Sequence, residues 1–372
     1  MSRSRDNADA VTTVPSGVGR NMIINGGMNV SQRATSVTGI GAADGYFTCD
    51  RWFLRSDATA GRLTMTQTAD GPNGISANCI KLDCTTADTS IAAGERLVLE
   101  QQIEGQNLQR IGKGVAGAKE TTLSFYVKAS AAFTFVVSLF DGDNDRMISK
   151  LYDTTTDWVR HEIIIPADVD DGSSPYDDDN ATSLFVQFFL HAGATFAGGT
   201  LQSGSFANNV DANRAAGCES FFSSTNNNFF LTGVQMEVGP VATEFEQEDI
   251  STTLTKCQRY FQKQIATGSV FERFGMGFAN TTSNFNTIIP MQVPMRATPS
   301  IQTTGTVGNY ATYHANTVTA ATAISLDNNA DGAGKQVGVN VTDSNAGFTV
   351  GRSGMFIAND NAAAFIALEA EL

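Results

Sequence analysis

The chain has 372 residues, a formal charge of −14 and a pI of about 4.6. It is longer than one ordinary core, and its 41% hydrophobic and 17% charged residues exclude a disordered protein. The negative charge repels phosphate groups, which excludes nucleic acid as a partner bound through its backbone.

Composition also indicates the class of fold and the compartment. Thirty-five glycines and only eight prolines, with abundant Thr, Ser and Asn, favour short strands joined by turns. The five cysteines form no Cys-x-x-Cys pair and their odd number leaves one unpaired, so we expect assembly in a reducing compartment. No segment resembles a signal peptide or supplies the roughly 20 apolar residues that span a bilayer, so we expect neither Sec export nor membrane insertion.

In chain order, residues 1–20 are small and polar, which predicts either an attachment arm or a frayed terminus. Residues 21–249 alternate short apolar runs with turn-forming clusters, the pattern of a jelly-roll-type β-sandwich. The predicted strands include residues 97–103, 121–128, 133–140, 159–165, 183–190 and 228–238.

The next segment, residues 250–265, places Leu254, Cys257, Tyr260 and Phe261 at helical spacing after Ser251, a candidate N-cap. We therefore predict a connector helix. Residues 266–372 return to strand-like runs separated by Gly and Asn, which predicts a smaller C-terminal β domain. Its expected strands are residues 287–295, 300–304, 336–341 and 347–350, with prolines at edges or bulges.

Two motifs resemble those of a known group. The opening segment Asn21-Met-Ile-Ile-Asn-Gly-Gly-Met-Asn-Val-Ser-Gln-Arg33, followed by Asp50-Arg-Trp52, resembles the start of a family of phage tail-fibre and virion-associated proteins. The closing segment Gly233-Val-Gln-Met-Glu-Val-Gly239, followed by Cys257-Gln-Arg-Tyr-Phe261, resembles that family's closing signature. The resemblance implies a sandwich similar to carbohydrate-binding modules, a homotrimer and a place in a virion assembled in the host cytoplasm.

The same residues have a physical interpretation of their own. Trp52 would bury a large aromatic surface, while Arg51 would donate hydrogen bonds to carbonyl groups or to a carboxylate. The Gly26-Gly27 pair fits either a turn or a close approach between backbones. These motifs therefore indicate residues that pack the interior of the sandwich, and we expect any recognition surface to lie in loops further along the chain.

The segment Asp141-Gly-Asp-Asn-Asp145 is the strongest candidate for a metal site. Asp141, Asp143 and Asp145 alternate in a loop after a strand, where their oxygens could converge on a structural calcium ion. The segment departs from an EF-hand, since Arg146 stands where glycine is required. A turn with solvated acids is the alternative, favoured by roughly three to one. Residues 141–180 hold twelve acidic against three basic residues, which predicts either hydrated loops or a patch that docks on a basic partner.

No nucleophile elbow, P-loop, dinucleotide fingerprint or zinc spacing is present, so we expect no enzyme and no cofactor other than calcium. Aromatic side chains could stack on sugar rings where they are exposed. Tyr176, in the acidic loop, is the best candidate, and Trp158 beside Asp157 is the second; Tyr46, Trp52 and Tyr126 fit a core better.

The sequence thus favours a structural and adhesive virion component, most simply a tail fibre or related appendage. Its expected partners are other virion proteins, further copies of the chain and a host cell-surface glycan. One alternative keeps the fold but places the protein on the capsid, as a decoration or head-fibre protein. Another is a polysaccharide depolymerase, because a glycosidase needs only two carboxylates that the fold brings together.

Overall fold

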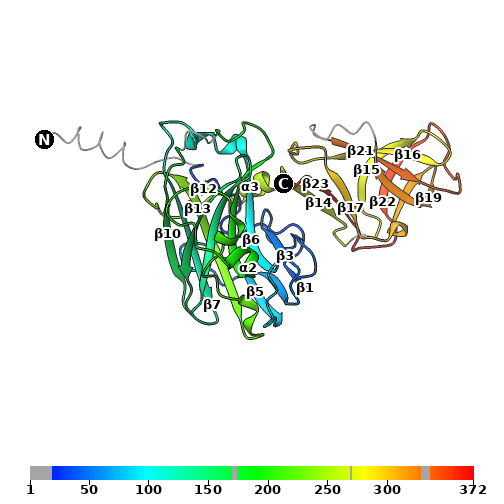
Figure 1. Ribbon diagram of the computed structural model, residues 1–372. Helices are drawn as coiled ribbons and strands as arrows, with labels where there is room; N and C mark the ends of the chain where they lie inside the picture. The colour runs from blue at the N-terminus through cyan, green and yellow to red at the C-terminus, as the bar shows by residue number, and fades with distance from the viewer. Residues whose placement is uncertain (1–18, 170–173, 269, 328–335) are drawn as a thin grey trace. The chain divides into compact units, whose positions relative to one another are not determined.

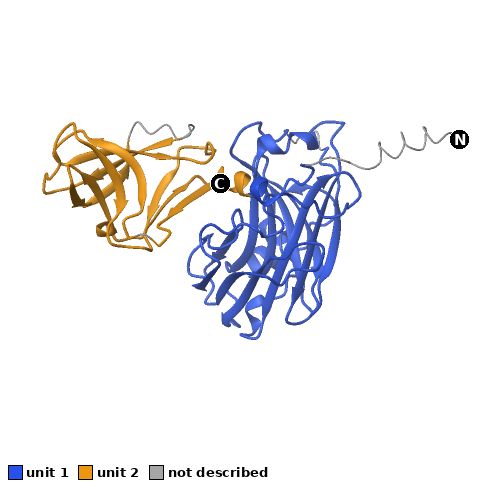
Figure 2. Ribbon diagram, turned by 180° about the vertical axis from the view of Figure 1, so that it is seen from behind, with its two compact units in different colours: residues 1–253, 372 blue, residues 254–371 orange. Residues whose placement is uncertain are grey.

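The computed structural model describes residues 19–169, 174–268, 270–327 and 336–372, and these form two compact β-rich units. Residues 1–253 with residue 372 make up unit 1, and residues 254–371 make up unit 2 (Figure 2). The predicted arm, residues 1–20, lies outside the described residues except for its last two. No helix in the described part of the chain is long and apolar enough to cross a membrane.

Unit 1 is a sandwich of two antiparallel sheets (Figure 1). Sheet 1 has the order β1 (Ser36–Ile40), β4 (Arg62–Thr68), β5 (Cys79–Thr86), β13 (Asn228–Val238), β7 (Thr121–Ala129) and β10 (Val159–Ile165). Sheet 2 has the order β12 (Ala207–Asn208), β9 (Arg146–Asp153), β8 (Thr134–Asp141), β11 (Thr182–Ala192), β6 (Arg96–Glu104), β3 (Phe53–Asp57) and β2 (Gly45–Tyr46). The prediction of an all-β chain built on a jelly-roll-type sandwich is confirmed.

Alternation along the strands fills the space between the two sheets. In β11 the side chains of Leu184, Val186 and Phe188 point inward and are fully buried, and successive strand residues point to opposite faces. Trp52 joins this core with no exposed surface, and its ring centroid lies 6.3 Å from that of Phe188. Its indole Nε1 donates a hydrogen bond to the Asn25 carbonyl, so its polar atom is paired as well.

The opening segment forms turns that dock on β13, rather than a strand of its own. The Met22 amide donates to the Met236 carbonyl, and the Val234 amide donates to the Gly26 carbonyl at 3.0 Å. A Cβ on Gly26 would lie 2.0 Å from the Val234 oxygen, so glycine is needed for a close backbone approach. The opening and closing motifs therefore contact each other directly.

The connector helix is shorter than the sequence indicates. Helix α3 spans Ile250–Gln258, and the Asp249 carboxylate, rather than Ser251, accepts the capping hydrogen bond, which comes from the Ser251 amide at 2.9 Å. Beyond it, residues 259–260 of the predicted helix form a turn and the rest form strand β14 (Phe261–Ile265), which pairs with β23 (Phe365–Glu369). Burial explains the change, because Phe261 is buried within unit 2 on this strand.

Unit 2 holds the C-terminal strands around a second core. Sheet 3 has the order β14, β23 (Phe365–Glu369) and β17 (Ser300–Thr303). Sheet 4 has the order β19 (Thr317–Ala320), β18 (Tyr310–His314), β22 (Ser353–Ala358), β15 (Arg273–Ala279), β16 (Asn284–Pro290), β21 (Gln336–Thr342) and β20 (Ala323–Leu326). Pro290 ends a central strand instead of lying at an edge, and the strand expected at residues 347–350 is absent from that described segment.

Candidate functional site

The outer face of sheet 2 combines a covered half with a more open half. Helix α2 (Ala194–Ala197) and the chain after it lie over Val98, Val136 and Phe189, which pack with Phe196 in a small satellite core (Figure 1). Away from this cover, side chains of β3, β8 and β11 on the same face are half-exposed. The open half is therefore where sheet 2 offers a surface to a ligand.

Strand register places one row of residues across this face. Phe53 of β3 is opposite Glu100 of β6, Glu100 is opposite Gln187 of β11, and Gln187 is opposite Ser138 of β8. Tyr46 of β2 extends the row at one end, where its ring contacts that of Phe53 at 5.0 Å. Polar side chains thus occupy the centre of a strand face, and aromatic rings occupy its edge.

Glu100 is the centre of a hydrogen-bond network although its side chain is fully buried. Its carboxylate accepts hydrogen bonds from Arg55 at 2.9 Å, from the Gln187 amide at 2.6 Å and from the Gln102 amide at 3.2 Å. Gln187 in turn accepts a hydrogen bond from Arg214, whose guanidinium also lies over the Phe140 ring. These bonds fix the orientation of side chains that reach the surface.

Arg55 is the cation that this network presents to solvent. Partial burial acts to lower the pKa of Arg55, but the carboxylates of Glu100, Asp44 and Asp57 together outweigh that effect and raise it. Its guanidinium lies 5.2 Å from the centre of the Phe53 ring and remains partly exposed. Arg55 therefore offers fixed donor groups beside an aromatic ring.

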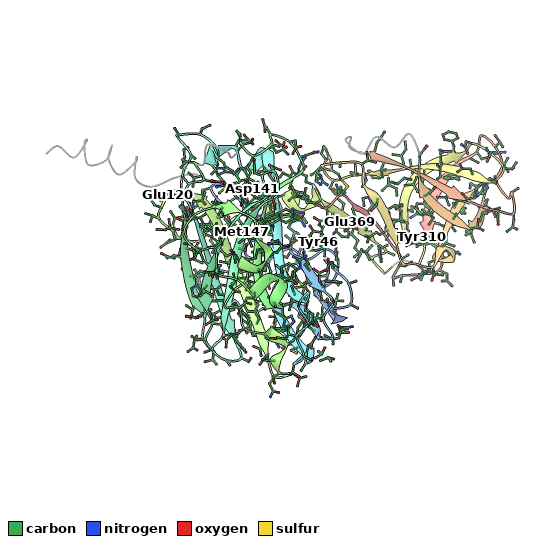
Figure 3. All side chains as sticks on the ribbon, in the orientation of Figure 1. Tyr46, Glu120, Asp141, Met147, Tyr310 and Glu369 are labelled. Atoms are coloured by element: carbon green, nitrogen blue, oxygen red, sulfur yellow. The ribbon has the colours of Figure 1, made fainter. Side chains whose placement is uncertain are left out.

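The neighbouring row supplies further rings. Gln102 is opposite Phe185, and Phe185 is opposite Phe140, with the two ring centroids 5.6 Å apart. Both rings are half-exposed. We define Phe53, Arg55, Gln102, Phe140 and Phe185 as the sheet-face patch. Tyr46 and Met147, labelled in Figure 3, mark the β2 side and the β9 side of this sheet.

The acidic segment after β8, residues 141–145, borders the patch and is the predicted metal site. Asp141, labelled in Figure 3, is fully buried, lies 2.6 Å from the ammonium of Lys113 and accepts the Asp143 amide. Asp143 and Asp145 are exposed, and Asp143 accepts the Asp177 amide. Within the described residues their oxygens do not converge as a metal site. The segment forms a turn in which Asp143 and Asp145 are solvated, whereas Asp141 is buried against Lys113.

The ion pair between Lys113 and Asp141 belongs to a larger buried cluster of charges. Lys113 also lies 3.9 Å from Asp168, and Arg146 donates two hydrogen bonds of 2.8 Å to the Asp168 carboxylate. All four side chains are at least nine-tenths buried. Burial raises the pKa of Asp141, while Lys113 acts in the opposite direction. This buried cluster anchors the loops beside the patch.

The two aromatic residues predicted for glycan binding differ in exposure. Tyr176 is buried, with the Lys113 ammonium over its ring, and this burial raises its pKa, so the expectation of an exposed ring is wrong. Trp158 is half-exposed, but it precedes β10 of sheet 1, where its indole donates to Asp70. Neither belongs to the sheet-face patch.

Sequence reasoning missed the patch because its members look like ordinary strand residues. One signal was present, since Glu100 and Gln102 take alternate positions of β6 in a polar stretch between the apolar Leu99 and Ile103. Gln187 likewise interrupts an aromatic run in β11. Polar residues at alternate positions of a strand indicate a face that does not pack in the main core.

The fold defines an all-β protein with a two-sheet sandwich and a second β unit. No protein-family model and no curated protein sequence matches the chain. Similar solved structures include a module described as CBM4, with 12% identity, 57% of this chain and 97% of that chain covered, and a TM-score of 0.29. The enzymatically active domain of bacteriophage CBA120 tailspike protein 4 has 10% identity and a TM-score of 0.29.

For the tailspike, the aligned region covers 59% of this chain and only 21% of that chain. A family 11 carbohydrate-binding module from Clostridium thermocellum, solved with a mixed-linked tetrasaccharide, has 11% identity and a TM-score of 0.26, with coverage of 56% and 98%. At such TM-scores these comparisons identify neither a ligand nor an activity for this chain.

Proposed function

We propose that the chain is a structural and adhesive component of a phage virion that binds a host-surface glycan through the sheet-face patch. The observation that carries the binding proposal is the register of sheet 2, which places half-exposed rings beside fixed polar groups. Rings stack on the apolar faces of sugars, and Arg and Gln side chains donate hydrogen bonds to hydroxyl groups. The virion assignment rests on the resemblance of the opening and closing motifs.

The role proposed for the patch is binding rather than catalysis. Glu100, the carboxylate at its centre, is held by Arg55, Gln102 and Gln187 and has no exposed surface. Those bonds suit a carboxylate that orients its neighbours. Shallow contacts of this kind are weak singly, and several copies on one particle would raise the avidity.

Two substitutions test the patch on a printed glycan array with the full-length protein. Phe185→Ala removes a stacking ring and Arg55→Ala removes fixed donors, and each is expected to weaken binding by about 2- to 12-fold, since a stacked ring and a hydrogen bond are each worth roughly 0.5–1.5 kcal/mol. Trp158→Ala is the control, because this ring lies on sheet 1. Unchanged binding by both patch variants, or no bound glycan for the wild type, would contradict the proposal.

Self-association is the second part of the proposal, and we assign it to sheet 4. Register places Ile288, Met276, Met355, Tyr313 and Val318 in one row across five neighbouring strands. Met276 is 72% exposed, and Ile288, Tyr313 and Val318 are also exposed. A cavity of about 240 Å³ lies beside this row, which we call the apolar row. Exposed apolar patches of this kind mark interaction sites.

Charge favours a further copy of the chain as the occupant. Residues 254–371 contain seven basic and seven acidic residues, so the whole excess of negative charge lies in residues 1–253. Copies therefore meet least repulsion through unit 2. The homotrimer suggested by the family resemblance would use this face.

Met276→Lys is expected to convert the oligomer to monomer, because it places a charge in the middle of the apolar row. Sedimentation velocity of the full-length protein measures the change in mass. Thr319→Lys is the control, since Thr319 follows the row residue Val318 on β19 but lies outside the row. A monomeric wild type, or a Met276→Lys variant with unchanged mass, would refute this assignment. Imaging of the assembled phage particle would then distinguish a position on the tail from a position on the capsid.

A further inference from the structure

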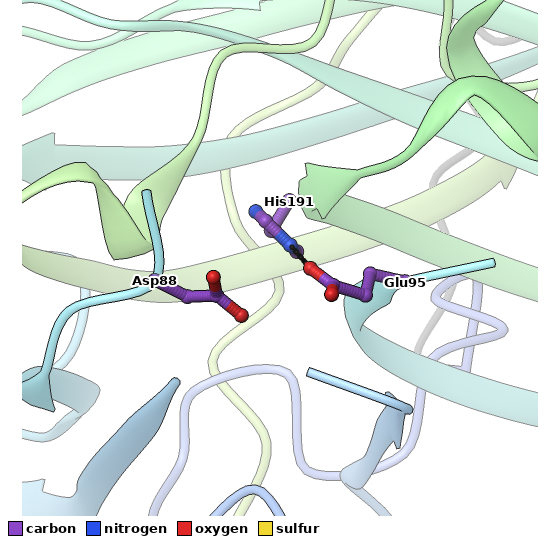
Figure 4. Close-up of side chains that lie close together, drawn as sticks. All are labelled: Asp88, Glu95 and His191. Carbon is purple, nitrogen blue, oxygen red and sulfur yellow. Dashed lines mark hydrogen bonds and ion pairs between the residues drawn. The ribbon is translucent and has the colours of Figure 1, made fainter. Parts of the chain in front are cut away.

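Three buried ligand-type side chains meet at one end of the sandwich. Asp88 follows β5, Glu95 precedes β6, and His191 lies near the end of β11 (Figure 4). One potential ligand atom from each residue lies within 4.8 Å of the others, and no other such group of His, Cys, Asp and Glu occurs among the residues whose structure is described. Asp88 and Glu95 belong to the connection between β5 and β6, whereas His191 comes from a strand far away in the sequence.

The imidazole is already oriented toward the two carboxylates. His191 Nδ1 lies 2.8 Å from the Ser220 hydroxyl, and Nε2 faces Glu95 Oε2 at 3.2 Å, the contact drawn in Figure 4. When Nδ1 carries the proton and donates to Ser220, the Nε2 lone pair is directed at the carboxylate. Two acceptors that face each other require a proton or a cation between them. A hydrogen-bonded Nδ1 is also how metal-binding histidines are usually fixed.

Charge within the group is not balanced by basic side chains. Asp88 and Glu95 are each 5% exposed and His191 is fully buried. Asp88 accepts from the Thr59 hydroxyl and from the amides of Ala60 and Ser90. In the part of the chain that is described, neither carboxylate forms an ion pair with Lys or Arg. Buried charges are normally paired or bound to a metal, so the group favours a cation.

We propose that Asp88, Glu95 and His191 bind a divalent transition-metal ion, with zinc as the best match. Imidazole nitrogen selects zinc and related ions over calcium and magnesium, which take oxygen ligands, and carboxylates complete the set. Carboxylate oxygens that already accept hydrogen bonds keep further lone pairs for a metal. The ion would tie the β5–β6 connection to the end of β11. This structural site is independent of glycan binding.

Isothermal titration calorimetry on the full-length protein, after treatment with a chelator, tests the site with zinc chloride as the probe. One zinc ion per chain is expected, while calcium and magnesium chloride give no heat of binding. At a zinc concentration 100-fold above Kd, the unfolding midpoint is expected to rise by roughly 5–10 °C. His191→Gln and Glu95→Gln are each expected to weaken binding by at least about tenfold, and Ser220→Ala by about tenfold.

His161→Gln is the matched control, because His161 is half-exposed on β10 and bonds only to a backbone carbonyl through Nε2. Cobalt chloride distinguishes this site from the free cysteines, since cobalt bound to thiolate absorbs strongly in the near ultraviolet and cobalt bound to nitrogen and oxygen does not. Circular dichroism confirms that each variant is folded. No zinc binding by the wild type, unchanged affinity in folded His191→Gln and Glu95→Gln, or a thiolate spectrum would overturn the proposal.

Discussion

Lys113→Met is expected to lower the free energy of unfolding of unit 1 by about 3–5 kcal/mol, the usual cost of leaving a buried charge without its partner. Lys113 is 3% exposed, and its ammonium is the cation nearest Asp141 and also donates to the Ser174 carbonyl. Methionine keeps most of the side-chain length but leaves the Asp141 carboxylate without this cation. Urea unfolding of the full-length protein, followed by circular dichroism, measures the change.

Two further variants make the urea-unfolding test specific to the ion pair between Lys113 and Asp141. Lys119 is exposed in the same loop, so Lys119→Met is expected to change the free energy of unfolding by less than about 0.5 kcal/mol. Adding Asp141→Asn to Lys113→Met removes the charge left behind and is expected to restore part of the loss. A Lys113→Met protein as stable as the wild type would show that this ion pair does not hold the loops.

Trp52→Ala is expected to cost about 3–5 kcal/mol of unfolding free energy, because it empties a large volume in a close-packed core. Trp52 has no exposed surface, contacts Phe188 and donates its indole hydrogen bond to Asn25. The opening segment packs beside it, so losing this ring also loosens that segment. Urea unfolding again gives the free energy.

Trp158 provides the matched comparison, as it is the second of the two tryptophans and is half-exposed. Trp158→Ala is expected to cost less than half as much as Trp52→Ala. Trp52→Phe is expected to lie in between, because it retains a ring but loses the bond to Asn25. Equal losses for the two alanine variants would contradict the role assigned to Trp52.

Six of the thirteen strands that the structure describes in unit 1 could be predicted, because runs of β-branched and aromatic residues mark them in the sequence. The expected segment 228–238 coincides with β13, and 183–190 lies within β11. The end of the connector helix could not be predicted, since the spacing of Tyr260 and Phe261 continues the helical pattern, whereas Tyr260 is buried in a turn and Phe261 is buried at the start of β14. Docking of the opening segment on β13 depends on contacts between residues more than two hundred positions apart.

The candidate sites were less accessible to sequence reasoning. The alternating acids predict a metal site at Asp141, Asp143 and Asp145. The charge of Asp141 is instead neutralised by Lys113, which is distant in sequence. Tyr176 looked exposed because its loop is polar, but its ring packs beneath that same lysine. The patch depends on strand order, which places β3, β6, β11 and β8 side by side, and no local pattern encodes that order.

The two proposed functions are assigned to different units: glycan binding to the sheet-face patch of unit 1, and self-association to the apolar row of unit 2. Unit 1 carries the negative charge and the polar, aromatic face of sheet 2, which suits a polar and uncharged or cationic ligand. Unit 2 is neutral overall and exposes apolar side chains on sheet 4. Association is thus assigned to a different face from the sheet-face patch, and several weak sites on one oligomer would act together.

Hydrogen–deuterium exchange of the full-length protein, with and without the oligosaccharide that binds best on the array, tests the central claim most directly. Slower exchange is expected in β3, β6 and β11, which carry the patch residues Phe53, Arg55, Gln102 and Phe185. Strands β4 and β5 of sheet 1 are expected to be unaffected. Protection confined to sheet 1 or to residues 254–371 would contradict the assignment of glycan binding to the sheet-face patch.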